Sequence, residues 1–110
     1  MNYQHKELAE GRWAKLTFFE QMANIGSEVE RALSWKEKNN IEYSQKAFER
    51  ALELIDLTLE NTKGLPRLKE IARVRESLVD YFFGVNQFES TEDFWRKYFF
   101  SFTFACRKNY

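Results

Sequence analysis

Glycine and proline are scarce in this chain, and their positions constrain its fold more than any other feature. Only 4 glycines and 1 proline occur among the 110 residues. A sheet needs many tight turns, which these residues usually supply, whereas long helices need only occasional breaks. Gly64, Pro66 and Gly84 fall between stretches with helical periodicity. The sequence therefore predicts an all-α protein.

Apolar residues recur at intervals of three and four along four stretches, which is the pattern of amphipathic helices. After a polar N-terminal arm over 1–11, the predicted helices cover about 12–38, 42–61, 66–83 and 91–107. Short linkers between long helices favour antiparallel neighbours. We expect one domain over 1–110 that folds as an antiparallel up-down four-helix bundle.

The composition restricts the chemistry that the chain can perform. Because 44% of residues are hydrophobic and 31% charged, the chain has enough apolar surface to fold. Basic and acidic residues number 17 each, so no overall field attracts nucleic acid or an anionic membrane. Cys106 is the only cysteine and His5 the only histidine, which excludes an internal disulfide and a site of several cysteines or histidines. We expect no metal and no cofactor.

The sequence also bears on localisation. The first residues lack the apolar run of a signal peptide, and no segment contains the roughly 18 uninterrupted apolar residues of a membrane span. A single cysteine is typical of a reducing compartment. We therefore expect a cytoplasmic protein with no membrane partner.

The last predicted helix is unusually aromatic, since 7 of the 11 residues over 94–104 carry aromatic rings. Phe100 and Phe104 project from the side opposite to most of the others, and a helix apolar on most sides is normally buried on most sides. On the second predicted helix, Leu54 and Leu57 lie away from the main apolar stripe. These four residues predict an interface with a second copy, a dimer being the first guess, or with another protein. The alternative is a central helix and scattered surface leucines.

Arg75 lies at the centre of the third apolar stripe. A buried guanidinium keeps its charge and needs a carboxylate partner. Glu28 and Asp56 lie at the margins of their own stripes, from which they can turn inward. We predict a buried ion pair of Arg75 with one of these carboxylates. The alternative is a polar pocket for a ligand.

Glu53 and Asp56 have the spacing that places two carboxylates on adjacent turns of one helix, where they can bind Mg²⁺. This element resembles half of the site of helical nucleotide pyrophosphohydrolases of the MazG kind. The second half in that family is a Glu-x-x-Glu element, and here the only one is Glu7 to Glu10, in the arm. A Mg²⁺-dependent phosphohydrolase that uses Glu49, Glu53 and Asp56 is the second alternative function.

Two basic pairs are candidates for contact with nucleic acid. One pair shares a side of the third predicted helix, where acidic residues follow as ion-pair partners, and the other closes the fourth. The candidate contacts are Lys69, Arg73, Arg107 and Lys108.

The segments 27–32 and 47–54 resemble the first helical hairpin of HEPN-type bundles, and the likeness covers about half of the chain. HEPN ribonucleases share an arginine followed four to six residues later by histidine, and no arginine here has such a partner. The resemblance therefore implies a HEPN-like bundle without the ribonuclease site. The helical pattern is also similar to accessory bundle proteins of diversity-generating retroelements, which are oligomers that serve a reverse transcriptase. Those proteins are strongly basic, whereas this chain is neutral.

These observations favour a small bacterial helical-bundle protein that is not an enzyme and acts through self-association or protein-protein interaction. The alternative is an accessory protein of a nucleic-acid system, which binds RNA, DNA or a reverse transcriptase as the two resemblances imply. Salt-dependent binding to RNA or DNA distinguishes the two, because phosphate contacts release counterions and hydrophobic docking does not.

Overall fold

The structure, a computed structural model, describes residues 11–108 and contains no strand within that range. Each helix within residues 11–108 is either too short or too polar to span a lipid bilayer. The elements are the 3-10 helix η2 (Trp13–Lys15) and the α-helices α1 (Phe18–Glu37), α2 (Ile41–Asn61), α3 (Leu65–Phe83) and α4 (Glu92–Lys108). The predicted all-α class is confirmed.

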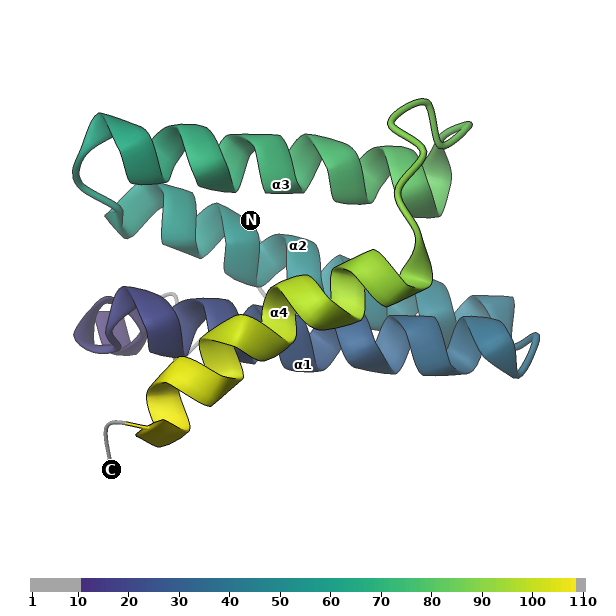
Figure 1. The fold of residues 1–110 in the computed structure, drawn as a ribbon, viewed down its shortest axis with the longest axis horizontal. Helices are drawn as coiled ribbons and strands as arrows, with labels where there is room; N and C mark the ends of the chain where they lie inside the picture. The colour runs from purple at the N-terminus through teal and green to yellow at the C-terminus, as the bar shows by residue number, and fades with distance from the viewer. Residues whose placement is uncertain (1–10, 109–110) are drawn as a thin grey trace.

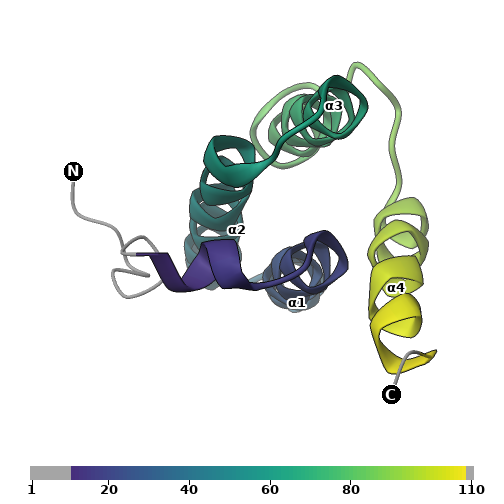
Figure 2. The ribbon, with the colours of Figure 1, turned by 90° about the vertical axis from the view of Figure 1, so that its left-hand side faces the viewer.

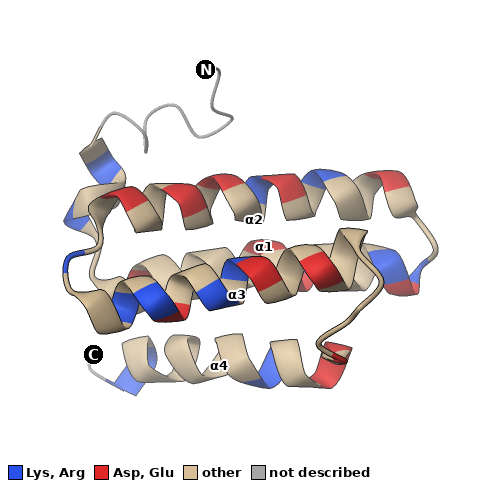
Figure 3. Ribbon diagram, turned by 90° about the horizontal axis from the view of Figure 1, so that it is seen from above, with Lys and Arg blue, Asp and Glu red and all other residues tan. Residues whose placement is uncertain are grey.

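Successive helices run in opposite directions, in the spatial order α3, α2, α1, α4 (Figures 1 and 2). α1 packs against both α2 and α4, and α2 also packs against α3, whereas the described lengths of α3 and α4 do not pack closely together. Acidic residues line the outward edge of α2 (Figure 3). The predicted up-down bundle is therefore confirmed. The position of α4 in it is set mainly by packing against α1.

The N-terminal part of the bundle differs from the prediction of one helix over 12–38. The backbone is extended at Leu16 and Thr17, which separate η2 from α1. Thr17 Oγ1 accepts a hydrogen bond from the backbone N–H of Glu20 at 3.1 Å, and the Glu20 carboxylate accepts one from the N–H of Thr17 at 2.9 Å. This capping box satisfies donors that the first turn leaves free, so α1 begins at Phe18.

Trp13 fixes η2 to α2. Its side chain is buried, and its Nε1 donates a hydrogen bond to Thr58 Oγ1 at 2.9 Å. The Thr58 hydroxyl in turn donates to the carbonyl of Leu54 at 2.8 Å. Gln21 Nε2 donates to the carbonyl of Trp13 at 2.9 Å, so η2 is also held from α1. A segment outside the four α-helices thus contributes a large side chain to the core.

The prediction that Leu54 and Leu57 belong to an interface is wrong. Their side chains are only 3% and 2% exposed, and both belong to the core. Spacings of three and four residues place them on the same side of α2 as Thr58, which is where η2 packs. A prediction based on four helices alone leaves this side of α2 without a packing partner. In the structure, Trp13 of η2 covers it.

Replacing Trp13 with alanine should lower the free energy of unfolding by about 3–5 kcal/mol, because the change removes a buried indole and leaves a cavity against α2. Urea denaturation followed by circular dichroism measures the effect. Phe88→Ala is the control, since that ring is 53% exposed and its loss should change stability by no more than about 0.5 kcal/mol. Equal losses in the two variants would contradict the role of Trp13.

Candidate interaction site

α4 presents aromatic side chains on two sides. Trp95 and Phe99 are buried, at 2% and 4% exposure, whereas Phe100 and Phe104 are 60% and 57% exposed. The ring centroids of Phe100 and Phe104 are 6.3 Å apart, so the two rings form one continuous apolar projection. We call this pair the α4 ridge. The structure thus places both aromatic candidates at the surface, one turn apart.

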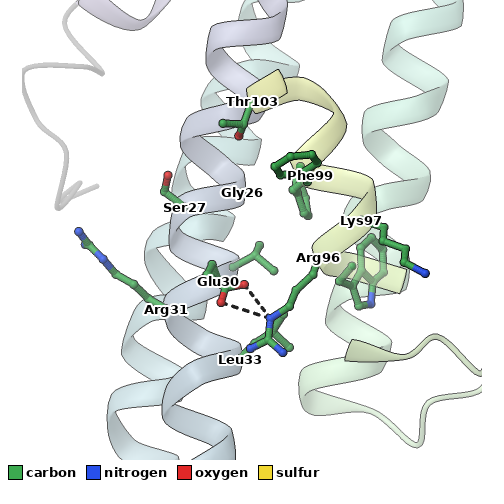
Figure 4. A pocket seen from close by; sticks show the side chains of 12 residues that line it. Gly26, Ser27, Glu30, Arg31, Leu33, Arg96, Lys97, Phe99 and Thr103 are labelled. Atoms are coloured by element: carbon green, nitrogen blue, oxygen red, sulfur yellow. Dashed lines mark hydrogen bonds and ion pairs between the residues drawn. The ribbon is translucent and has the colours of Figure 1, made fainter. Parts of the chain in front are cut away.

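A groove of about 650 Å³ lies between α1 and α4 (Figure 4). Val29 and Leu33 form its floor from α1, and Trp95 and Phe99 form it from α4; each of these side chains is at most 4% exposed. Phe100 lines the groove as well as belonging to the α4 ridge. We call this the α1–α4 groove. The remaining lining residues are Gly26, Ser27, Glu30, Arg31, Arg96, Lys97 and Thr103.

α4 approaches α1 most tightly at Gly26. A Cβ atom added to Gly26 would lie 2.7 Å from the Cβ of Phe99, which is closer than carbon atoms can pack. Glycine in the middle of a helix costs roughly 0.5–1 kcal/mol relative to alanine. The close contact with Phe99 is a physical reason for glycine at this position, and it sets where α4 crosses α1.

Arg96 joins α4 to α1 at the groove, and Figure 4 shows its contact with Glu30 of α1. Its Nε lies 2.9 Å from Glu30 Oε2 and its Nη1 lies 2.8 Å from Glu37 Oε1, and the guanidinium also contacts Glu92 on the preceding turn. The hydrogen bond to Glu30 is the main cause that raises the pKa of Arg96, partial desolvation opposes it, and Glu37 adds to it. Because the Arg96 side chain is 33% exposed, we assign it to orientation of α4 rather than to a large gain in stability.

Tyr98 links α4 to α3 through a hydrogen bond, although the two helices do not pack closely against each other. Its hydroxyl donates a hydrogen bond to Glu70 Oε2 at 2.6 Å. Burial, reinforced by the neighbouring Glu70 carboxylate, raises the pKa of Tyr98 far above its ordinary value. The phenol therefore remains a neutral donor at physiological pH, and it fixes the inner side of α4 while the α4 ridge faces away.

Arg75 makes the predicted contact without the predicted burial. Its Nε lies 2.8 Å from Asp56 Oδ1, but the two side chains are 40% and 44% exposed. Glu28 is nearly buried and pairs instead with Arg31 and Arg50, at 3.3 Å and 3.5 Å. α3 packs against α2 and not closely against α1, so Asp56 is within reach of Arg75 whereas Glu28 is not. The length of the arginine side chain lets its charged end reach solvent.

The four predicted nucleic-acid contacts are all exposed and form two pairs. Lys69 and Arg73 lie in the first half of α3, and Arg107 and Lys108 are the last residues of α4. None of them forms an ion pair with a carboxylate of residues 11–108. The expected pairing with the acidic residues that follow on α3 is therefore not formed.

No group of three acidic, cysteine or histidine side chains within residues 11–108 is arranged to hold a metal ion. Glu49, Glu53 and Asp56 thus do not gather into the Mg²⁺ site of the phosphohydrolase alternative. Asp56 instead binds a guanidinium. The other residues considered for metal chemistry, Glu7, Glu10 and His5, lie outside the described residues.

Comparisons of the chain with protein-family models, with curated proteins and with solved structures found no match. The resemblances to HEPN bundles and to retroelement accessory proteins therefore remain expectations from the sequence. We infer the function from the α4 ridge, the α1–α4 groove and the distribution of charge.

Gly26→Val should lower the free energy of unfolding by about 1–3 kcal/mol, because the added side chain overlaps Phe99 and forces α4 away from α1. Ser27→Val is the matched control, since it adds the same side chain type at the next, exposed position. Its effect should stay near 0.5 kcal/mol. Urea denaturation of the two variants measures the difference, and equal stabilities would contradict the tight crossing at Gly26.

Arg75→Ala should cost no more than about 1 kcal/mol, because a half-exposed ion pair is worth little. A buried pair that loses one partner would cost about 3–5 kcal/mol. A double-mutant cycle with Asp56→Ala isolates the coupling between the two side chains. A loss near the larger figure would show that the pair is desolvated in solution.

Proposed function

We propose that this protein is a non-enzymatic helical bundle that acts by binding protein, in the first instance a second copy of itself. The observation that carries the proposal is the position of the α4 ridge beside the α1–α4 groove. Phe100 belongs to both, so one surface offers a protruding apolar element next to an apolar depression.

The α4 ridge differs from ordinary exposed apolar side chains. Single exposed residues such as Leu65, which is 62% exposed on the first turn of α3, are common on soluble proteins. Phe100 and Phe104 are instead neighbours on one helix, and apolar groove residues adjoin them. Contiguous apolar surface of this kind marks a site of interaction.

The energy of association requires the groove as well as the ridge. Full burial of one phenylalanine contributes roughly 1.5–3 kcal/mol. Association costs an estimated 4–15 kcal/mol in lost translational and rotational freedom. A symmetric dimer buries two partly exposed rings from each subunit, and seating each ridge in the opposite groove brings the sum into the lower part of that range.

A dimer with two-fold symmetry pairs the α4 ridge and the α1–α4 groove of each subunit at the same time. Because each subunit carries the ridge and the groove side by side on the same helix, rotation by half a turn can place each ridge in the opposite groove. Such self-complementary contacts are the commonest way in which soluble proteins form closed dimers. A dimer in which the two α4 helices face each other is therefore the assembly that we propose.

Phe100→Glu and Phe104→Glu should each convert the dimer into a monomer while helical content is retained, because both rings are exposed in the single subunit. Sedimentation velocity at micromolar concentration measures the mass, and circular dichroism measures the helix. Leu65→Glu is the matched control, since it places the same charge at an equally exposed position, and the dimer should persist.

A substitution in the α1–α4 groove provides a separate test of the dimer. Ser27 is exposed on the α1 side of the groove, so Ser27→Trp should fill the groove and dissociate the dimer without disturbing the core. A wild-type protein that sediments as a monomer contradicts self-association. Dissociation by Leu65→Glu as strongly as by Phe100→Glu contradicts the proposed location.

A further inference from the structure

Positive charge on the described part of the chain divides into compensated and uncompensated groups. Ion pairs to described carboxylates neutralise Arg31, Lys46, Arg50, Arg75, Arg96 and Lys97. Lys36 and Lys38 lie over the rings of Tyr81 and Trp35. Seven other cations have no ion-pair partner within residues 11–108, and these are Lys15, Lys63, Arg67, Lys69, Arg73, Arg107 and Lys108.

The seven uncompensated cations belong to η2, to the linker before α3, to the first half of α3 and to the last turn of α4, and we call the end of the bundle that these segments share the basic end. The antiparallel arrangement brings the start of α3 to the same end as the last turn of α4 (Figure 1), and Figure 3 shows basic residues there on both helices. α3 begins without an acidic residue in its first turn, so the positive end of its dipole adds to the field. In the same view the acidic edge of α2 faces away from α4.

A polar hollow opens at the basic end. It has a volume of about 220 Å³ and is lined by Gln21, Asn61, Thr62, Lys63 and Arg67 among others. The guanidinium of Arg67 lies 4.6 Å from the ring centroid of Phe18, which orients it beside the hollow. Gln21, Asn61 and Thr62 donate to backbone carbonyls, so the groups that the hollow offers to a ligand are the two uncompensated cations Lys63 and Arg67.

We propose that the basic end binds the phosphate backbone of a single nucleic-acid strand. Lysine and arginine contacts to successive phosphates supply sequence-independent affinity for such polymers. At 100° per residue, Lys69 and Arg73 project from a side of α3 away from Arg67, and Arg107 and Lys108 lie on another helix. A flexible chain of phosphates can follow charges placed around the end of a bundle, whereas a flat membrane contacts only one side. Lys63, Arg67, Lys69 and Arg73 lie apart from the α4 ridge, whereas Arg107 follows Phe104 by one turn on the same side of α4.

Fluorescence anisotropy with a labelled single-stranded RNA of mixed sequence, and with DNA of the same sequence, tests the proposal over a range of salt concentrations. The wild-type protein should bind both, with an affinity that falls as salt rises. The double variants Lys69→Gln/Arg73→Gln and Arg107→Gln/Lys108→Gln should each weaken binding about tenfold at low salt. Each phosphate contact removed should reduce the slope of log affinity against log salt by about 0.7.

The matched control is Lys38→Gln/Lys46→Gln, which removes the same charge at the opposite end of the bundle and should leave binding within about twofold of the wild type. Phe100→Glu, which tests the dimer, should still bind RNA at the basic end. Circular dichroism verifies that each variant is folded. If the Lys69→Gln/Arg73→Gln variant does not fold, the Arg107→Gln/Lys108→Gln variant provides the test. Absence of salt-dependent binding, equal weakening by the control, or binding to phosphatidylserine vesicles but not to RNA or DNA would overturn the proposal.

Discussion

The close packing of α4 on α1 at Gly26 is the constraint on which the rest of the surface depends. Phe99 occupies the space that a side chain at position 26 would fill, so the two helices cross at this point. Arg96 holds the crossing from the solvent side through Glu30 and Glu37. Tyr98 holds it from the inner side through Glu70. These contacts fix the rotation of α4 about its own axis.

The rotation of α4 decides which of its aromatic rings are covered. With Trp95 and Phe99 buried and Tyr98 directed to α3, Phe100 and Phe104 must project outward. Because α4 packs closely against α1 and not against α3, no other described element covers these rings. The α1–α4 groove results from the same crossing, since its lining comes from the two helices on one side of it. Ridge and groove are thus products of a single packing arrangement.

Periodicity and helix-breaking residues were sufficient to predict the bundle, because four amphipathic stripes with short linkers have few ways to bury their apolar sides. The sequence did not reveal the cover that η2 gives to α2, because Trp13 lies outside the apolar stripes and its contact with Thr58 spans 45 residues. A glycine inside a strong helical pattern is a signal of close approach, and Gly26 therefore carried readable information about the crossing of α4.

Ion-pair partners that lie far apart in the sequence were harder to predict than the helices. The spacing of Glu92 and Arg96 predicts a contact within α4, but nothing in the sequence indicates that Glu30 and Glu37 of α1 complete the cluster. For Arg75, position in an apolar stripe predicted burial, whereas the flexible stem carries the guanidinium to the margin of the α2–α3 contact. Because the arginine side chain is long, its charged group can lie far from the position of its Cα atom.

The central claim is that the outward side of α4 is the surface on which a second copy docks. Hydroxyl-radical footprinting of the wild-type protein, carried out at concentrations below and above that at which it associates, tests this claim most directly. The predicted result is that Phe100 and Phe104 become protected as the concentration rises, while the equally exposed Leu65 keeps a constant reactivity. Reactivities of Phe100 and Phe104 that do not change with concentration would contradict it.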